Sequence, residues 1–118
     1  MKRLLLIATF LLCSVARAAH RHHHLVLAGW YGPRFKGRKT ASGEIFNPQS
    51  LTVASLTYKL GTRLKLCNPK YVHRCVEVRV NDRGPFVKGR GLDVSERVAE
   101  ILGFKQRGLA WLDVERVN

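Results

Sequence analysis

Acidic side chains are scarce in this chain, which has eight Asp and Glu residues against 21 Lys and Arg and a formal net charge of +13. The chain also lacks an apolar segment of membrane-spanning length, because the apolar run at residues 4–16 is shorter than the roughly 20 residues that a spanning helix needs. The first deficit leaves few carboxylates for acid–base catalysis, and the second argues against a membrane anchor. The excess of positive charge favours polyanionic partners.

Residues 1–18 have the features of a secretory signal peptide. Lys2 and Arg3 precede the apolar run, and Ala16, Arg17 and Ala18 form a small-x-small cleavage site. We predict cleavage after Ala18 and export to the periplasm or the cell exterior, in association with the cell wall. The remaining chain has the size of one domain. In an exported protein this much positive charge indicates cell-wall polymers or anionic membrane surfaces as partners, rather than nucleic acid.

Residues 19–24 form a histidine-rich tract. Such a tract can bind a transition metal, but we interpret it as a flexible, polar N-terminus. No other segment indicates a metal site, and the sequence implies no cofactor.

Two cysteines, Cys67 and Cys75, lie outside the predicted signal peptide. An even number of cysteines in a small exported domain favours a disulfide. Apolar and polar residues alternate in residues 63–67 and 75–80, which places both thiols on the polar face of two adjacent strands. We therefore predict a Cys67–Cys75 disulfide across a β-hairpin, with two free thiols as the alternative.

The remaining patterns predict a mostly β protein with one short helix. Ser95 is the expected N-cap of that helix and Gly103 its end. Glycine-rich turns between short strands are typical of a small barrel. The expected strands are residues 25–31, short strands within 50–60, the hairpin strands 63–67 and 75–80, and residues 110–117, with an exposed loop at 32–43.

Five short segments occur in a characteristic order along residues 25–118. They are Gly-Trp-Tyr-Gly at 29–32, Thr-Ala-Ser-Gly-Glu at 40–44, Leu-Gly-Thr-Arg at 60–63, Val-Arg-Val-Asn-Asp-Arg-Gly-Pro-Phe at 78–86 and Leu-Asp-Val-Ser at 92–95. In order and spacing these segments resemble the RlpA-like (rare lipoprotein A) domain. The resemblance implies a six-stranded double-psi β-barrel, a fold shared with expansins, and lytic transglycosylase activity on peptidoglycan glycan strands.

The implied reaction cleaves the bond between N-acetylmuramic acid and N-acetylglucosamine without water. The 6-hydroxyl of the muramic acid closes onto its own anomeric carbon and leaves a 1,6-anhydro end. One carboxyl group can protonate the leaving oxygen and then accept the hydroxyl proton. The resemblance implies that Asp82 has this role, although an aspartate in an Asn-Asp-Arg-Gly turn can also bind its own turn.

Glu44 and Asp93 are the other candidate catalytic carboxylates. The resemblance places Glu44 at the active cleft and Asp93 along a polysaccharide groove. The alternatives are a solvated loop carboxylate for Glu44 and a helix cap or an ion pair with a nearby arginine for Asp93.

Two positions depart from the family pattern, because Asn47 and Ser55 stand where the family usually has aspartate and histidine. Asparagine cannot transfer a proton, and a serine hydroxyl cannot replace an imidazole that titrates near neutral pH. A non-catalytic, expansin-like module that binds or loosens the wall therefore stays as an alternative. A third possibility is a barwin-like barrel that binds polyanions.

We expect a glycan to contact five side chains: Trp30, Tyr31, Asn47, Ser55 and Arg83. Aromatic faces stack on sugar rings, although most aromatic residues of a small domain belong to its core. A basic run in the loop at residues 34–39 can also meet the lactyl carboxylates of muramic acid. The sequence does not predict an oligomeric state.

Overall fold

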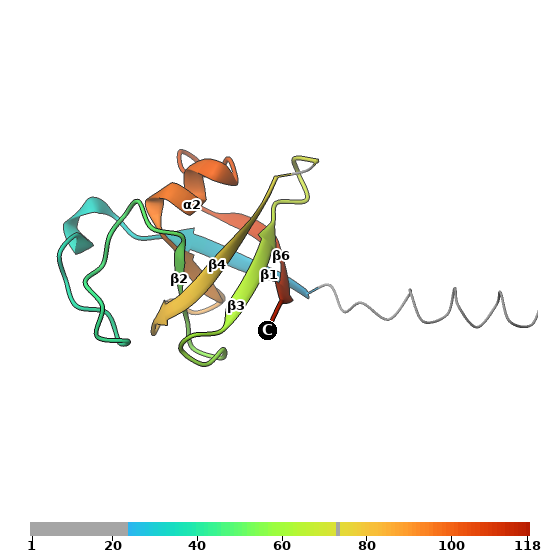
Figure 1. Cartoon of the computed structure of the whole chain (residues 1–118). Coiled ribbons are helices and arrows are strands. Elements are labelled where there is room, and N and C mark those ends of the chain that lie inside the picture. The colour runs from blue at the N-terminus through green and yellow to red at the C-terminus, as the bar shows by residue number, and fades with distance from the viewer. Residues whose placement is uncertain (1–23, 73) are drawn as a thin grey trace, which may run out of the picture.

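The computed structural model describes residues 24–72 and 74–118, which form a six-stranded barrel with the helix at one end (Figure 1). The predicted signal peptide and residues 19–23 lie outside the described residues. The strands close in the order β1-β5-β2-β4-β3-β6, which confirms the predicted fold class. Their bounds are β1 His24–Trp30, β2 Thr52–Ser55, β3 Arg63–Cys67, β4 Cys75–Asp82, β5 Leu92–Val94 and β6 Ala110–Arg116, with a 3-10 helix η1 Pro33–Phe35 and the helix α2 Glu96–Ile101.

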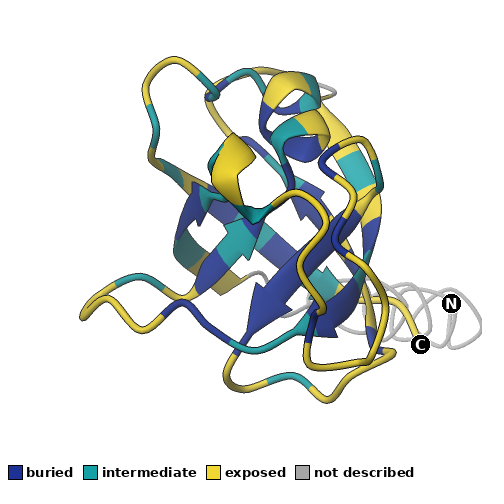
Figure 2. Cartoon of the chain, turned by 90° about the vertical axis from the view of Figure 1, so that its left-hand side faces the viewer, coloured by how far each residue is buried: buried dark blue, intermediate teal, exposed yellow. Residues whose placement is uncertain are grey.

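The barrel interior is filled by every second residue of its strands. Leu64 and Leu66 of β3 and Val78 and Val80 of β4 are buried, while the residues between them are exposed or half-buried. Each such side chain contributes about 1.5–3 kcal/mol when it is fully buried. Figure 2 shows buried residues concentrated on the strands and exposed residues on the loops around them. The period-two alternation in the sequence is therefore the pattern that fixes which side of each strand faces the core.

The β3–β4 hairpin has the predicted disulfide. Cys67 and Cys75 are direct partners in the antiparallel register, and their sulfur atoms are bonded. In the chain-entropy model, closing so short a loop stabilises the fold by about 2–3 kcal/mol. The turn is also fixed from outside the hairpin, because the side chain of Asn68 donates a hydrogen bond to the carbonyl of Leu102 at 2.8 Å.

Helix α2 begins and ends as its sequence predicts. The Ser95 hydroxyl accepts a hydrogen bond from the amide of Val98 at 3.3 Å, which makes it the N-cap. Gly103 follows the helix with a φ of 77°, a conformation that favours glycine. Val98 and Leu102 are fully buried in the core. Neither α2 nor η1 is long enough to cross a membrane, and no other helix occurs in residues 24–72 and 74–118.

Two strands differ in detail from the sequence analysis. Strand β1 begins at His24, which the sequence analysis assigned to the flexible tract. Strand β5 is only three residues long and lies between β1 and β2, parallel to β1 and antiparallel to β2. Periodicity alone could not resolve it, since three residues are too few to show an alternation. This short strand nevertheless carries Asp93 and brings it beside β1 and β2.

Candidate functional site

Two carboxylates lie at the same level on strands that flank β2. Ala54 of β2 pairs with Asp82 of β4 on one side and with Asp93 of β5 on the other. Asp93 also pairs with Gly29 of β1. Paired residues of neighbouring strands share a face, and strands are about 4.8 Å apart, so the backbones at Asp82 and Asp93 are separated by about 10 Å. We call Gly29, Asp93, Ala54 and Asp82 the carboxylate row.

Asp82 accepts three hydrogen bonds. Its Oδ1 atom accepts from the amides of Ala41 at 2.9 Å and of Arg83 at 2.8 Å, and its Oδ2 atom accepts from the Tyr31 hydroxyl at 2.9 Å. The bond from Arg83 is the local turn contact that the sequence analysis raised as an alternative. The other two bonds come from distant parts of the chain. The half-buried carboxylate is therefore held by the β1 end, by the loop before β2 and by its own turn.

Tyr31 supports Asp82 from the end of β1. Its ring stacks on Phe46 at 4.6 Å between centroids, and Phe35 meets the ring edge-on at 5.6 Å. Burial raises the pKa of the Tyr31 hydroxyl well above its ordinary value, and the hydrogen bond to Asp82 raises it further. The phenol therefore stays protonated and acts as a donor. The sequence analysis chose Tyr31 for stacking on sugar and missed this contact with Asp82.

Trp30 lies apart from Tyr31, although the two are adjacent in sequence. Successive residues of an extended chain point to opposite sides. The Trp30 indole donates to the carbonyl of Lys105 at 3.0 Å, and the ring packs against the core. The two aromatic residues proposed for glycan contact therefore do not form one platform. The alternation of the strand, visible in the sequence, was the signal that could have separated them.

Glu44 forms an ion pair with Arg79. Its Oε2 atom lies 2.9 Å from Nη2 of Arg79, and its Oε1 atom contacts Nη1 of the same guanidinium. The Ser42 hydroxyl also donates to Glu44 Oε1, at 3.1 Å. The hydrogen bond from Arg79 lowers the pKa of this exposed carboxyl. The amide of Ser42 donates to the carbonyl of Asn81 at 3.0 Å. The same loop therefore holds both Glu44 and the backbone donor to Asp82 against the end of β4.

Asp93 is half-buried beside Arg90, with 3.4 Å between Oδ1 and Nη1. Burial raises the pKa of Asp93, and the charge of Arg90 opposes that rise. Gly29 leaves the space for this pair, because a Cβ there would lie 2.9 Å from the Arg90 guanidinium and from Asp93 Oδ1. The ion pair that the sequence analysis raised as an alternative is therefore present.

Arg83 and Ser55 lie together at the turn that follows β2. Arg83 Nη1 donates to the carbonyls of Ser55 at 2.7 Å and Tyr58 at 2.6 Å. The Ser55 hydroxyl accepts from the amides of Thr57 and Tyr58, at 3.1 and 3.0 Å, and the residue has no exposed surface. The Arg83 side chain therefore fastens the β2–β3 turn to the end of β4, and the Ser55 side chain fixes the turn itself.

Asn47 and the basic residues of the loop at 34–39 are exposed. Asn47 Oδ1 accepts from the amide of Gln49 at 2.9 Å, a local turn contact. The guanidinium carbons of Arg34 and Arg38 lie 5.1 and 5.6 Å from the centre of the Phe35 ring. No cluster of three or more metal-ligating side chains occurs in residues 24–72 and 74–118.

The arrangement is suited to proton transfer at one atom. Asp82 Oδ1 already accepts two hydrogen bonds, whereas Oδ2 accepts one. Because each carboxylate oxygen has two lone pairs, Oδ2 has the free capacity for a proton or for a hydroxyl donor. Glu44 is bound to one arginine and Asp93 faces another. Of these three carboxylates, Asp82 is the one that has only neutral hydrogen-bond donors as partners.

Sequence comparison places these residues in a family. The profile of the family described as lytic transglycolase matches residues 24–114. A probable endolytic peptidoglycan transglycosylase RlpA of Synechocystis is 47% identical over 83 residues, which cover 70% of this chain and 26% of the relative. The endolytic peptidoglycan transglycosylase RlpA of Rickettsia bellii is 45% identical over 94 residues, which cover 77% and 41%. The chain thus spans a quarter to two fifths of the length of these relatives.

Solved structures support the fold. The Streptomyces papain inhibitor matches with a TM-score of 0.64 at 19% identity, over 82% of this chain and 96% of the inhibitor. A Clavibacter michiganensis expansin variant in complex with cellohexaose matches with a TM-score of 0.64 at 20% identity, over 82% of this chain and 51% of the expansin. At these identities the likeness concerns the double-psi β-barrel alone. The family profile and the RlpA relatives together establish that the chain belongs to the RlpA-like family of lytic transglycolases.

Proposed function

We propose that this domain is a lytic transglycosylase that cleaves the bond between N-acetylmuramic acid and N-acetylglucosamine in peptidoglycan glycan strands, with Asp82 as its acid/base. The observation that carries the proposal is the environment of the Asp82 carboxylate. Three neutral donors fix its position, and Oδ2 keeps capacity for one further partner. The relatives named as RlpA transglycosylases supply the reaction class.

In the proposed reaction Asp82 acts twice through Oδ2. The protonated carboxyl first donates its proton to the glycosidic oxygen, and the bond from that oxygen to the anomeric carbon breaks. The 6-hydroxyl oxygen of the same muramic acid then bonds to the anomeric carbon, while its proton passes to Oδ2. Asp82 ends protonated as it began, and no water is consumed. Between the two transfers, Tyr31 and the two amides stabilise the negative charge of the carboxylate.

The other predicted site residues have supporting roles in this proposal. Asp93 lines the saccharide path along the carboxylate row, and Glu44 with Arg79 keeps the loop of residues 40–44 against β4. Asn47 is exposed and available for a glycan contact. Ser55 and Arg83 act by fixing the turn after β2. Tyr31 acts through Asp82, so it is a positioning residue.

A product assay tests the proposal. Purified domain is incubated with glycan strands stripped of stem peptides, and the fragments are analysed by liquid chromatography with mass spectrometry. The expected products have 1,6-anhydro-muramic acid ends. Fragments with ordinary reducing ends would show hydrolysis instead, and the complete absence of fragments from strands that bind would contradict an enzymatic role.

The alternative is an expansin-like module that binds the wall without cleaving it. Asn47 and Ser55 favour it, since these positions provide neither the carboxylate nor the imidazole usual in the family. Binding to insoluble peptidoglycan, measured for wild type and for Asp82→Asn, separates the two functions. An enzyme loses turnover in the variant and keeps binding, whereas a pure binding module shows no turnover in either protein.

A further inference from the structure

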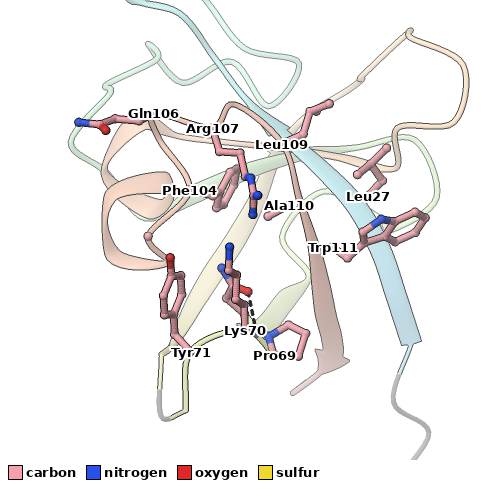
Figure 3. Close-up of a pocket in the computed structure, with 12 residues that line it drawn as sticks. Leu27, Pro69, Lys70, Tyr71, Phe104, Gln106, Arg107, Leu109, Ala110 and Trp111 are labelled. Carbon is pink, nitrogen blue, oxygen red and sulfur yellow. Dashed lines mark hydrogen bonds between the residues drawn. The ribbon is translucent and has the colours of Figure 1, made fainter.

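A hollow lies far from Asp82, at the other end of β4. It has a volume of about 890 Å³ and lies between the β3–β4 turn, the segment after α2 and the start of β6 (Figure 3). Asp82 ends β4 and Cys75 begins it, so the strand separates the two ends by about 23 Å at 3.3 Å per residue. We call this hollow the hairpin pocket. Its size falls within the range of ligand sites.

The charge of the hairpin pocket is of one sign. Lys70 of the turn and Arg107 of the segment after α2 line the pocket and extend into the same space from opposite sides in Figure 3. Among the residues that the structure describes, the lining includes no Asp or Glu. Within residues 24–72 and 74–118, neither cation forms an ion pair. The nearby Lys105 differs, because it contacts both Glu96 and Glu100. A pocket with two uncompensated cations attracts an anion.

Aromatic and aliphatic surface adjoins these cations. Trp111 points out of β6 with 58% of its surface exposed, and it is the direct partner of Leu27 on β1. Leu109 also lines the pocket and is 40% exposed. Tyr71 forms the other side, at 38% exposure. An exposed indole beside cations suits a ligand that has an apolar ring face and a carboxylate, as a muramic acid residue does.

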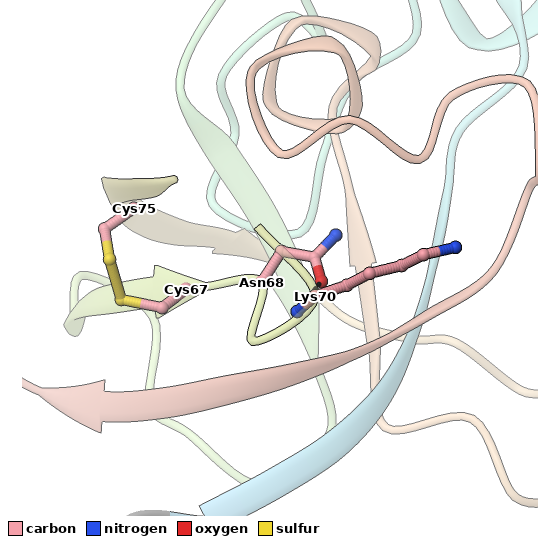
Figure 4. Close-up of a disulfide and its surroundings, with 4 residues drawn as sticks. All are labelled: Cys67, Asn68, Lys70 and Cys75. Carbon is pink, nitrogen blue, oxygen red and sulfur yellow. Dashed lines mark hydrogen bonds between the residues drawn. A yellow bond between two sulfur atoms is a disulfide. The ribbon is translucent and has the colours of Figure 1, made fainter. Parts of the chain in front are cut away.

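A disulfide and two hydrogen bonds at the hairpin end of β4, away from Asp82, fix the walls of the pocket. The disulfide closes the hairpin directly beside the turn that holds Asn68 and Lys70 (Figure 4). Asn68 Oδ1 accepts from the amide of Lys70 at 3.1 Å, and its Nδ2 donates to the carbonyl of Leu102 at 2.8 Å. These bonds hold the turn to the end of α2, so the pocket is formed before any ligand arrives. Preformed walls reduce the ordering cost of binding.

We propose that the hairpin pocket is a second binding site for carboxylated glycan, in which Lys70 and Arg107 bind lactyl carboxylates and Trp111 stacks on a sugar ring. Identifying the glycan as peptidoglycan rests on the proposed function. A glycan strand long enough to reach both ends of the domain is then bound at the pocket while another part of the peptidoglycan lies at Asp82. Cleavage itself does not require this site.

The test uses the Asp82→Asn protein, in which we expect bound glycan strands to stay intact because the proposed acid/base is absent. Denuded glycan strands are titrated into the ¹⁵N-labelled domain, and the indole resonance of Trp111 is followed by NMR. We expect that resonance to shift with the glycan, and the double change Lys70→Ala with Arg107→Ala to weaken its titration about five- to tenfold. Trp111→Ala should weaken the affinity of the strands about tenfold, and Trp111→Phe should restore most of it.

Matched controls separate this site from general charge. Lys65→Ala with Lys88→Ala removes the same charge from two exposed cations outside the pocket lining, and should leave the affinity within about twofold. Chitohexaose, which has no carboxylate, should bind wild type and the Lys70/Arg107 double variant equally. A Trp111 resonance that ignores the glycan, that responds to free stem peptide alone, or that titrates equally in both double variants would overturn the inference.

The outcome for the pocket is separable from the outcome for Asp82. If anhydro products form but the Trp111 resonance does not shift with glycan, the proposed function stands and the second site is contradicted. If the Trp111 resonance shifts but the wild-type domain cleaves no strands, the second site stands and the enzymatic role is contradicted.

Discussion

The two ends of strand β4 differ in whether their charged side chains have partners within the domain. At the Asp82 end each acid is bound: Glu44 contacts Arg79, Asp93 faces Arg90, and Asp82 accepts three hydrogen bonds. At the hairpin end, Lys70 and Arg107 line a pocket without an acid. One end therefore has side chains fixed at defined positions, as proton transfer needs, and the other has charge available to a ligand.

The aromatic residues repeat this contrast. Tyr31 is enclosed by Phe46 and Phe35 and uses its hydroxyl on Asp82. Trp111 is more than half exposed, and it lines the hairpin pocket together with Lys70 and Arg107. In the two proposals, positioning at Asp82 and glycan binding at the hairpin pocket therefore belong to separate ends of one small barrel, and substitutions at either end should affect one without the other.

The largest expected effect is at Asp82. Asp82→Asn keeps the size of the side chain but removes the group that donates and accepts the proton, so turnover should fall about 10²- to 10⁴-fold. Release of anhydro fragments measures the loss, and binding of strands at the hairpin pocket should change little. Turnover retained within a few-fold would assign the acid/base role to another residue.

The second largest effect is expected from removal of the disulfide, and it should affect the hairpin end of β4. Cys67→Ser with Cys75→Ser should lower the free energy of unfolding by about 2–3 kcal/mol, because the unfolded hairpin is no longer closed. Thermal unfolding measures this. Resonances of Lys70 and Tyr71 should shift more than those of Tyr31 and Ala41. Equal perturbation at both ends would show that the barrel does not separate them.

The sequence predicts those parts of the structure that depend on residues close together in the chain. The alternation in β3 and β4, the paired cysteines and the Ser95 cap each follow from neighbouring residues, and the structure confirms them. The three-residue strand β5 has too little sequence to show a period, so the six-stranded closure came from the family resemblance instead. Local pattern determines the strands, while their order around the barrel depends on contacts between distant segments.

The candidate site shows the same limit. Asp82 was identified from its motif, but its partners Tyr31 and Ala41 lie 51 and 41 residues away in the chain. The pairing of Glu44 with Arg79 joins two separate segments of the family motif. No spacing along the chain could show either contact, since closure of the barrel creates both.

A smaller effect is expected at Tyr31. Tyr31→Phe removes the hydroxyl that donates to Asp82 and keeps the ring that stacks on Phe46. Because hydrogen bonds to charged groups contribute about 1.5–3 kcal/mol, turnover should fall about 10- to 150-fold. The Michaelis constant should change little, which separates positioning from glycan stacking. Tyr31→Leu, without the ring, should also lower the melting temperature.

The smallest expected effect is on the pH dependence of stability, and it distinguishes Glu44 from Asp93. Arg79 lowers the pKa of Glu44, so the folded state favours the ionised form. That contribution is present above the unfolded pKa of about 4.3 and is lost as the pH falls through the lower folded value. Glu44→Gln should therefore cost under about 1 kcal/mol at pH 7, because the pair is exposed, and nothing near pH 2.

Urea unfolding measured at a series of pH values checks this prediction for Glu44, and Asp93 should show a pH dependence of opposite sign in the same measurements. Its pKa is raised, with burial as the larger cause and Arg90 opposing it, so the folded state binds the proton more tightly than the unfolded state. Stability should therefore decrease as the pH rises through the unfolded and then the folded pKa. Wild type minus Asp93→Asn isolates that slope, and wild type minus Glu44→Gln isolates the reverse one. Slopes of equal sign would mean that burial does not outweigh Arg90 at Asp93, and that Glu44 and Asp93 are both ordinary ion-paired acids.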